Sequence, residues 1–84
     1  MSYEINLTKL AERDFSKLDA KIAKQIVSAI DAMEKDPFVL NIKKLKRPLT
    51  GYRARSGDYR ILFVIDKKRI TIYSIRHRKD VYRY

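Results

Sequence analysis

Apolar and polar positions follow two different periods along this chain, and the change of period separates a helical half from a strand half. Residues 3–7 alternate, with Tyr3, Ile5 and Leu7 on one side, which is typical of a short half-buried strand. Thr8 is a residue type that favours a helix N-cap. A first helix is predicted from there, because apolar residues in and around it fall at nearly helical spacing: Leu7, Leu10, Ala11, Phe15 and Leu18.

A second helix is the most regular feature of the pattern. Asp19 is suited to cap its start. Apolar residues then recur at offsets of four, four and three, namely Ile22, Ile26, Ile30 and Met33. The helix is expected to end at Asp36, because the residue before a proline is pushed out of the helical region.

Beyond this helix the period changes to two. Residues 38–51 predict an irregular basic connection, since Pro48 and Gly51 interrupt any regular pattern. Segments rich in Ile, Val, Tyr and Phe follow with two-residue gaps, as in consecutive antiparallel hairpins: 52–56, 59–66 and 69–76. Residues 78–84 are compatible with one helical turn.

These elements predict an α+β fold in a single domain over residues 1–84. An N-terminal strand and a two-helix hairpin would pack on a mainly antiparallel four-stranded sheet, followed by a short C-terminal tail. The helices would bury the inward side chains of the sheet, including Ile61, Phe63, Ile65, Ile70 and Ile72. The opposite face of the sheet would stay accessible.

The first predicted turn fixes the register of its hairpin, whereas the second turn leaves the register of the next hairpin open. Gly57-Asp58 suits a type II′ turn, because glycine accepts the positive φ of its first position, and this turn places Arg55 opposite Arg60. Lys67-Lys68 is a poorer turn pair. A two-residue loop there would pair Arg60 with Ile75, whereas one further loop residue or a bulge would bring Arg76 opposite Arg60.

Charge is distributed unevenly along the chain. Residues 1–42 hold six Lys/Arg against seven Asp/Glu, whereas residues 43–84 hold fourteen against three, which gives −1 and +11. Such asymmetry is typical of proteins with a polyanionic partner, most commonly nucleic acid. The alternative is a basic surface that serves solubility alone.

Three arginines are expected on one face of the strand region, at Arg53, Arg55 and Arg60. Like charges directly opposite each other on a sheet are destabilising, by up to about 1 kcal/mol, so stability alone does not explain them. A bound phosphate would reverse the sign of that contribution, because arginine donates paired hydrogen bonds to phosphate oxygens. The alternative is that these arginines only contact water or the carboxylates of a partner.

Two motifs resemble a known family. The run from Gly51 to Phe63, with the residues Gly-Asp-Tyr-Arg at 57–60, and the run from Ser74 to Tyr82, with Arg-His-Arg-Lys-Asp-Val-Tyr at 76–82, resemble the C-terminal signature of RelE/ParE-superfamily toxins, RelE-like branch. The resemblance extends more loosely over the whole chain. It implies a RelE-like fold and the toxin of a type II toxin–antitoxin pair, whose RelE-type members cleave mRNA in the ribosomal A site.

The resemblance also implies site residues. Arg53 and Arg55 match the two basic residues of the family's second strand, Arg60 its phosphate-binding arginine, Arg76 the arginine ending the last strand, and Tyr82 the tyrosine near the C-terminus. The best-studied RelE-type toxins carry lysine at the first two positions. An arginine does not readily release a proton, so a general-base role at either position is in doubt.

The chemistry can be examined without the family. Metal-independent RNA cleavage requires activation of the 2′-hydroxyl, charge stabilisation at phosphorus and protonation of the leaving 5′-oxygen. His77 is the only histidine, which excludes a two-histidine mechanism, and Asp58, Asp66 and Asp80 are the only acids after residue 42, which argues against a two-metal one. We therefore expect no metal and no cofactor, with Arg60 and Arg76 on the scissile phosphate. Tyr82 would assist proton transfer or substrate placement, or else simply pack on the sheet edge.

Further basic residues are candidates for binding RNA or the ribosome: Lys43, Lys44, Lys46, Arg47, His77, Arg78 and Lys79. For His77 a structural surface role is the alternative, and for the lysine-rich connection an ordinary solvated loop. The expected partners are the ribosome and mRNA, an acidic RelB-like antitoxin, and operator DNA only indirectly through the antitoxin complex. Two other functions stay open, a ParE-like DNA gyrase inhibitor and a non-catalytic RNA- or ribosome-binding module.

The composition gives limits on the compartment. The chain has no cysteine, so neither disulfides nor thiolate metal sites hold it together. Its N-terminus lacks a basic segment followed by an apolar run, and no stretch of 18 consecutive apolar residues occurs. We expect a cytoplasmic protein with no membrane partner.

Overall fold

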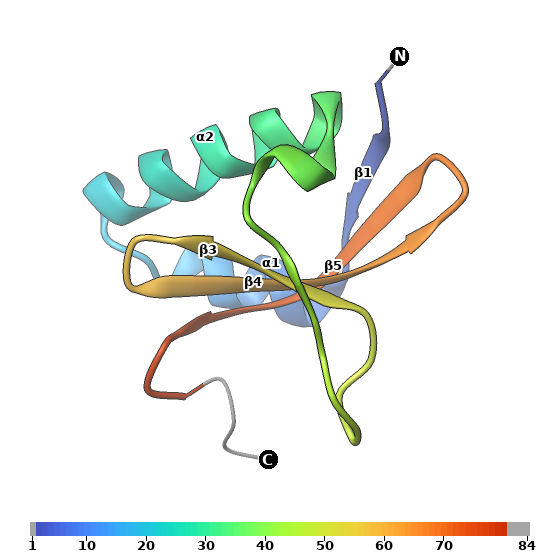
Figure 1. The fold of residues 1–84 in the computed structure, drawn as a ribbon. Helices are drawn as coiled ribbons and strands as arrows, with labels where there is room; N and C mark the ends of the chain where they lie inside the picture. The colour runs from blue at the N-terminus through green and yellow to red at the C-terminus, as the bar shows by residue number, and fades with distance from the viewer. Residues whose placement is uncertain (1, 81–84) are drawn as a thin grey trace.

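The computed structural model describes residues 2–80, and its elements follow the predicted order with additions in the connection after the second helix (Figure 1). They are β1 (Glu4–Leu7), α1 (Lys9–Ser16), α2 (Ala20–Lys35), the 3₁₀ helix η1 (Pro37–Val39), β2 (Lys43–Lys44), β3 (Tyr52–Ser56), β4 (Tyr59–Asp66) and β5 (Arg69–His77). Residues 78–80 form a turn, and the rest of the tail lies outside the described residues.

The sheet within residues 2–80 has five strands in the order β1-β5-β4-β3-β2. β1 runs parallel to β5 and the other neighbours are antiparallel. The α+β class is confirmed, but the expectation of four strands was wrong. The additional strand is β2, which pairs Lys43 with Arg53 and Lys44 with Tyr52. Two lysines carry no apolar alternation, so this edge strand forms through backbone pairing that the hydrophobic pattern cannot reveal.

The helix boundaries agree with the capping residues, with one exception. Thr8 caps α1, since its Oγ1 accepts a hydrogen bond from Ala11 N at 3.2 Å. Asp19 occupies the N-cap position of α2, but its side chain makes no capping hydrogen bond. α2 ends at Lys35, and Asp36 is extended with φ −163° as expected before Pro37. The Asp36 carboxylate instead accepts from Phe38 N at 3.0 Å and caps η1.

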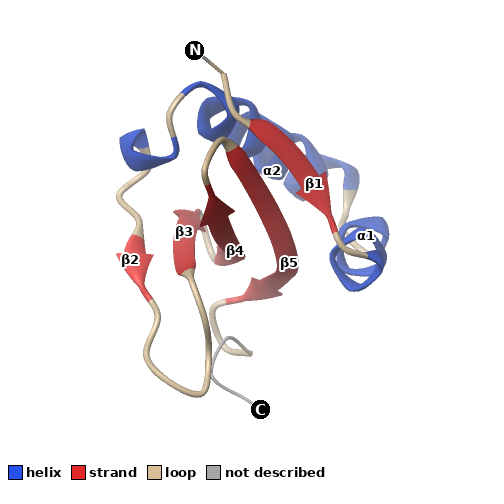
Figure 2. Ribbon diagram, turned by 90° about the vertical axis from the view of Figure 1, so that its right-hand side faces the viewer, coloured by secondary structure: helices blue, strands red, loops and turns tan. Residues whose placement is uncertain are grey.

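Both helices pack on the same face of the sheet (Figures 1 and 2). One cluster joins the buried residues of the helices, Ala11, Ile26, Ala29 and Met33, to those of the sheet, Ala54, Ile61, Phe63, Ile70, Ile72 and Ile75. Four of the five predicted core residues of the strands are fully buried, and Ile65 is half-buried against them. The face away from the helices is where Arg53, Arg55 and Arg60 lie, because they alternate with the buried Ala54 and Ile61.

Neither helix of residues 2–80 is long and apolar enough to cross a lipid bilayer.

Candidate functional site

Three arginines on three neighbouring strands lie opposite one another in the sheet register. Arg55 of β3 pairs with Arg60 of β4, which confirms the register predicted from the Gly57-Asp58 turn. Arg60 in turn pairs with Arg76 of β5. We call Arg55, Arg60 and Arg76 the arginine row. Arg53 lies one face-sharing position further along β3, opposite Leu62.

A β-bulge brings Arg76 into this row. The Lys67-Lys68 loop has two residues, because Asp66 pairs with Arg69, and this loop alone would pair Arg60 with Ile75. The pairing shifts between Phe63 and Leu62, whose partners are Ile72 and Ser74, so Tyr73 is the extra residue of β5. The structure therefore combines the short loop with a bulge.

The bulge also has a packing reason. In a regular strand Ile72 and Ile75 would point to opposite faces, since side chains alternate. Both belong to the core cluster on the helix side, which the extra residue makes possible. Arg76, which follows Ile75, is thereby turned to the open face with the other arginines.

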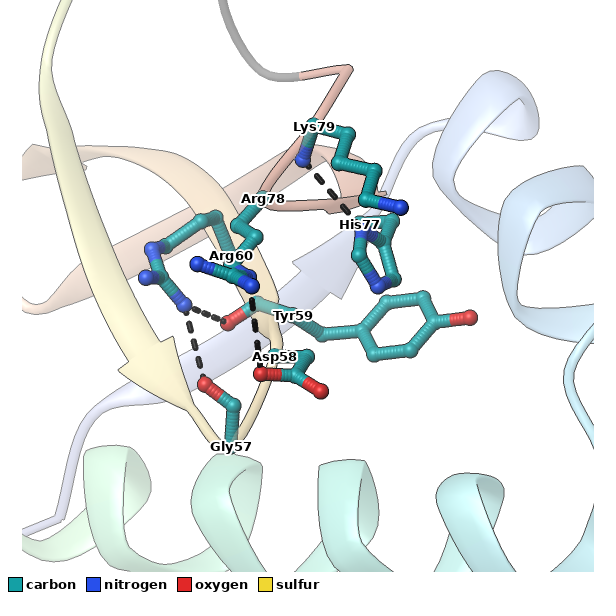
Figure 3. A network of polar contacts seen from close by, with 7 residues as sticks. All are labelled: Gly57, Asp58, Tyr59, Arg60, His77, Arg78 and Lys79. Carbon is teal, nitrogen blue, oxygen red and sulfur yellow. Dashed lines mark hydrogen bonds and ion pairs between the residues drawn. The ribbon is translucent and has the colours of Figure 1, made fainter.

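The Arg60 guanidinium is held by the turn of its own hairpin (Figure 3). Its Nη1 donates to Gly57 O and to Tyr59 O, both at 3.0 Å. Both hydrogen bonds use one nitrogen, so Nε and Nη2 remain able to donate to a ligand. The backbone of the turn thus fixes the position of Arg60 before any ligand arrives.

Arg60 lies among several positive charges that repel it. Burial lowers the pKa of the Arg60 guanidinium from its usual value, and the positive charges of Arg55, Arg53 and Arg78 lower it further, whereas Asp58 opposes them. Each of these cations raises the free energy of the others in the absence of a counter-ion. An anion bound among them would relieve that repulsion, because it interacts favourably with all of them at once.

The segment that follows β5 folds back onto the same turn (Figure 3). Arg78 N donates to Asp58 O at 2.7 Å, and Arg78 Nε lies 3.6 Å from an Asp58 carboxylate oxygen in an exposed ion pair. His77 packs edge-on against Tyr59, with ring centroids 5.4 Å apart, and its Nδ1 accepts from Lys79 N at 3.2 Å. These contacts gather three of the predicted RNA-binding residues at this turn, and the charge of Arg78 among them acts on Arg60. They also give His77 a structural role in the turn.

The basic connection, by which we mean Lys43, Lys44, Lys46 and Arg47, adjoins the arginines. Lys43 pairs with Arg53 across β2 and β3. The connection and Arg53 line a pocket of about 530 Å³, together with Leu45, Pro48 and Leu49. All four basic side chains of the connection are exposed. Positive charge is therefore continuous from the connection to the arginine row.

Sequence reasoning missed two residues beside the row, Ser74, which contacts Arg76, and Asp14, which contacts Ser74. Arg76 Nε donates to Ser74 Oγ at 2.8 Å, and Ser74 Oγ lies 3.4 Å from Asp14 Oδ2 of α1. The only signal was Ser74 itself, a hydroxyl in a strand of isoleucines, whose burial requires a partner. Tyr82, the last predicted site residue, lies outside the described residues. No group of three or more His, Asp or Glu within residues 2–80 is arranged to hold a metal ion.

Known proteins are similar to this chain over nearly its whole length. A family model described as the ParE toxin of the type II toxin–antitoxin system parDE matches residues 5–82. A protein named Toxin RelG from Mycobacterium tuberculosis is 37% identical over 87 residues, covering 99% of both chains. Toxin RelE of the same organism is 33% identical over 88 residues, covering 96% of this chain and 87% of that relative.

Solved structures give the same result for the fold. A chain of the toxin–antitoxin complex RelBE2 from Mycobacterium tuberculosis superposes with a TM-score of 0.81 at 32% identity, over 92% of this chain and 99% of that chain. The archaeal RelE–RelB complex from Pyrococcus horikoshii OT3 gives a TM-score of 0.78 at 26% identity, over 93% and 97% of the two chains. These similarities confirm the RelE-like fold.

Proposed function

Because this chain belongs to the RelE/ParE superfamily of toxins from type II toxin–antitoxin systems, we propose that it is a ribosome-dependent mRNA endonuclease of the RelE-like branch. The observation that carries the proposal is the arginine row on the face of the sheet opposite the helices. Guanidinium groups recognise phosphate oxygens by paired hydrogen bonds, and the arginine row presents three guanidinium groups from adjacent strands. One phosphodiester of a message fits this arrangement.

The reaction would be a metal-independent attack within the RNA. The 2′-hydroxyl loses its proton and bonds to the adjacent phosphorus, while the bond from phosphorus to the 5′-oxygen of the next nucleotide breaks and that oxygen gains a proton. The products are a 2′,3′-cyclic phosphate and a free 5′-hydroxyl. Arg60 and Arg76 stabilise the charge that develops on the non-bridging oxygens, at about 3–4 kcal/mol for each well-aimed donor. Tyr82 is assigned to proton transfer or substrate placement.

The roles of Arg53 and Arg55 are electrostatic. Arginine side chains do not readily release a proton, which argues against either residue as the general base. They bind the RNA backbone beside the scissile phosphate. A site with so few acid–base groups depends on its partner to align the message, and the ribosome supplies that alignment through proximity and orientation. The basic connection docks on ribosomal RNA phosphates, and His77, Arg78 and Lys79 contact RNA near the row.

The proposed inhibitor of this toxin is an acidic RelB-like antitoxin. The solved relatives named above are a toxin–antitoxin complex, RelBE2, and a RelE–RelB complex. A flexible acidic segment that covers the open face of the sheet would neutralise the arginines and exclude RNA at the same time. Operator DNA would be contacted only through that antitoxin.

A second candidate, inhibition of DNA gyrase, is favoured by the description of the matching family model as a ParE toxin. Expression in cells of the wild type, of Arg60→Ala and of Arg76→Ala distinguishes the two. Growth arrest and transcript cleavage within ribosome-bound codons should both be lost in the two variants, whereas Lys24→Ala, an exposed lysine of α2, should behave as wild type. Arrest by the wild-type protein without any transcript cleavage, accompanied by DNA damage, would favour gyrase.

A further inference from the structure

The edge of β5 changes partner at the bulge. β1 pairs with β5 only from Arg69 to Ile72. Beyond that point α1 takes the place of a strand. Thr8 N donates to Ile72 O at 3.0 Å, and Ile75 N donates to Asp14 Oδ2 at 3.0 Å. Asp14 therefore satisfies a strand N–H that has no neighbouring strand on this edge.

The same oxygen of Asp14 also ends a series of side-chain hydrogen bonds that leads to Arg76 of the arginine row. The Ser74 hydroxyl lies 3.4 Å from Asp14 Oδ2 and is the donor of that pair, because a carboxylate can only accept. Ser74 Oγ accepts in turn from Arg76 Nε at 2.8 Å. Ser74 is only 1% exposed, so its hydroxyl is shielded from water. The hydroxyl is thus oriented by Asp14 and presents its lone pair to Arg76.

We propose that Asp14 is a positioning residue for Arg76, acting through Ser74. The inference rests on the proposed role of Arg76 at the scissile phosphate. An arginine side chain has four rotatable bonds, and a fixed orientation requires that its freedom be removed before the substrate binds. Ser74, oriented by Asp14, restricts this freedom through its hydrogen bond to Arg76 Nε.

The position of Asp14 supports a role beyond stability. A pocket of about 350 Å³ opens where Asp14, Tyr59, Arg76 and His77 meet. The carboxylate is half-buried and lies at the base of Arg76, whereas the phosphate would bind at its tip. Truncating the Asp14 side chain therefore removes no charge from the arginine row itself but removes the acceptor that orients the Ser74 hydroxyl toward Arg76. The affinity for RNA should therefore stay close to that of the wild type, while the rate of cleavage falls.

Ser74→Ala is the sharpest variant, because it removes the link to Arg76 and keeps the hydrogen bond between Asp14 and Ile75 N. With purified toxin and ribosomes carrying a message, we expect kcat to fall about ten- to a hundredfold with little change in KM, as expected for misplacement of a positioned group. Asp14→Ala should show the same split. Asp14→Asn should recover most of the rate, because its amide oxygen can accept both hydrogen bonds.

Two controls separate positioning from folding. Thr8→Ala removes the cap of α1 and a contact of the Thr8 hydroxyl with Tyr73 O, at the same junction of α1 with β5 but without contact to Arg76. It should lower Tm and leave kcat unchanged. In the Arg76→Ala background, the residual rate measured at high toxin concentration should not fall further on adding Ser74→Ala or Asp14→Ala, because the group they act through is absent.

The outcomes distinguish the inference from the function on which it rests. If Arg76→Ala cleaves ribosome-bound message at the wild-type rate, both the proposed site and the positioning role are overturned. If Arg76→Ala is inactive while Ser74→Ala and Asp14→Ala retain full rate, only the positioning role is overturned. Exchange of the Arg76 Nε–H proton, followed by NMR on the free toxin, gives a readout without activity: it should be faster in Ser74→Ala than in wild type, and equal rates would refute the link.

Discussion

Arg60 and Arg76 stand directly opposite each other on β4 and β5 because β5 holds one residue more than β4 between this pair and the Lys67-Lys68 turn. The extra residue keeps Ile75 in the core and turns Arg76 to the open face. With Arg55 on the next strand, the pair places like charges at one level across three strands. Such an arrangement disfavours the fold and favours an anionic ligand, and both consequences can be measured.

Removing one member of the row should stabilise the free protein. Arg55 is exposed and lies opposite Arg60, so Arg55→Ala relieves a like-charge pair and should raise the free energy of unfolding by up to about 1 kcal/mol at low salt. The gain should shrink as salt is added, because screening weakens the repulsion. Urea unfolding at two salt concentrations measures it. Arg69→Ala, which instead breaks an exposed ion pair with Glu4, should be neutral or slightly destabilising.

Phosphate should stabilise the folded protein through the row. Inorganic phosphate that binds the native state raises Tm, and the rise grows with the ratio of the phosphate concentration to its Kd. We expect a rise in Tm for the wild type that is reduced in Arg60→Ala and Arg76→Ala, compared with chloride at equal ionic strength. An equal rise in both variants and the wild type would show that the anion binds elsewhere.

Two glycines with positive φ should respond differently to alanine. A Cβ at Gly51 would overlap the carbonyl oxygen of Phe63, a backbone atom that cannot move aside, so Gly51→Ala should cost about 2–4 kcal/mol of unfolding free energy. A Cβ at Gly57 would meet the flexible end of Gln25. Gly57→Ala should therefore cost only about 1 kcal/mol, mainly for its left-handed backbone. Chemical unfolding of both variants compares the two costs.

The affinity for ribosomes should depend steeply on salt through the basic connection. Each phosphate contact contributes about 0.7–0.9 to the slope of log affinity against log salt. Alanine at all four residues of the connection should reduce that slope by about 3 if each contacts a phosphate. The matched control replaces four exposed helix lysines, Lys9, Lys21, Lys24 and Lys35. A slope that falls equally in both variants would mean that the connection is an ordinary solvated loop.

Local pattern predicted the helices and the first hairpin, because both depend on residues close in sequence. Thr8 and Pro37 mark the two ends of the helical region, and Gly57 fixes the register that pairs Arg55 with Arg60. Side-chain detail within these elements was less predictable. Asp19 has the right residue type and position for a cap, yet its carboxylate makes no capping hydrogen bond.

Features that depend on distant residues did not follow from the pattern. The bulge at Tyr73 is selected by packing of Ile72 and Ile75 under the helices, which strand periodicity alone does not determine. Asp14 lies 61 residues from the N–H that it accepts from, so no local signal links them. β2 has two lysines and exists only through its pairing with β3.

The most direct measurement of the central claim uses purified ribosomes whose A site holds a defined codon. The wild-type protein should cleave that message and leave a 2′,3′-cyclic phosphate, while a message with 2′-deoxyribose at the scissile nucleotide should stay whole and Arg60→Ala should be inactive. Cleavage of the 2′-deoxy message, or full activity of Arg60→Ala, would contradict arginine-assisted attack by the 2′-hydroxyl.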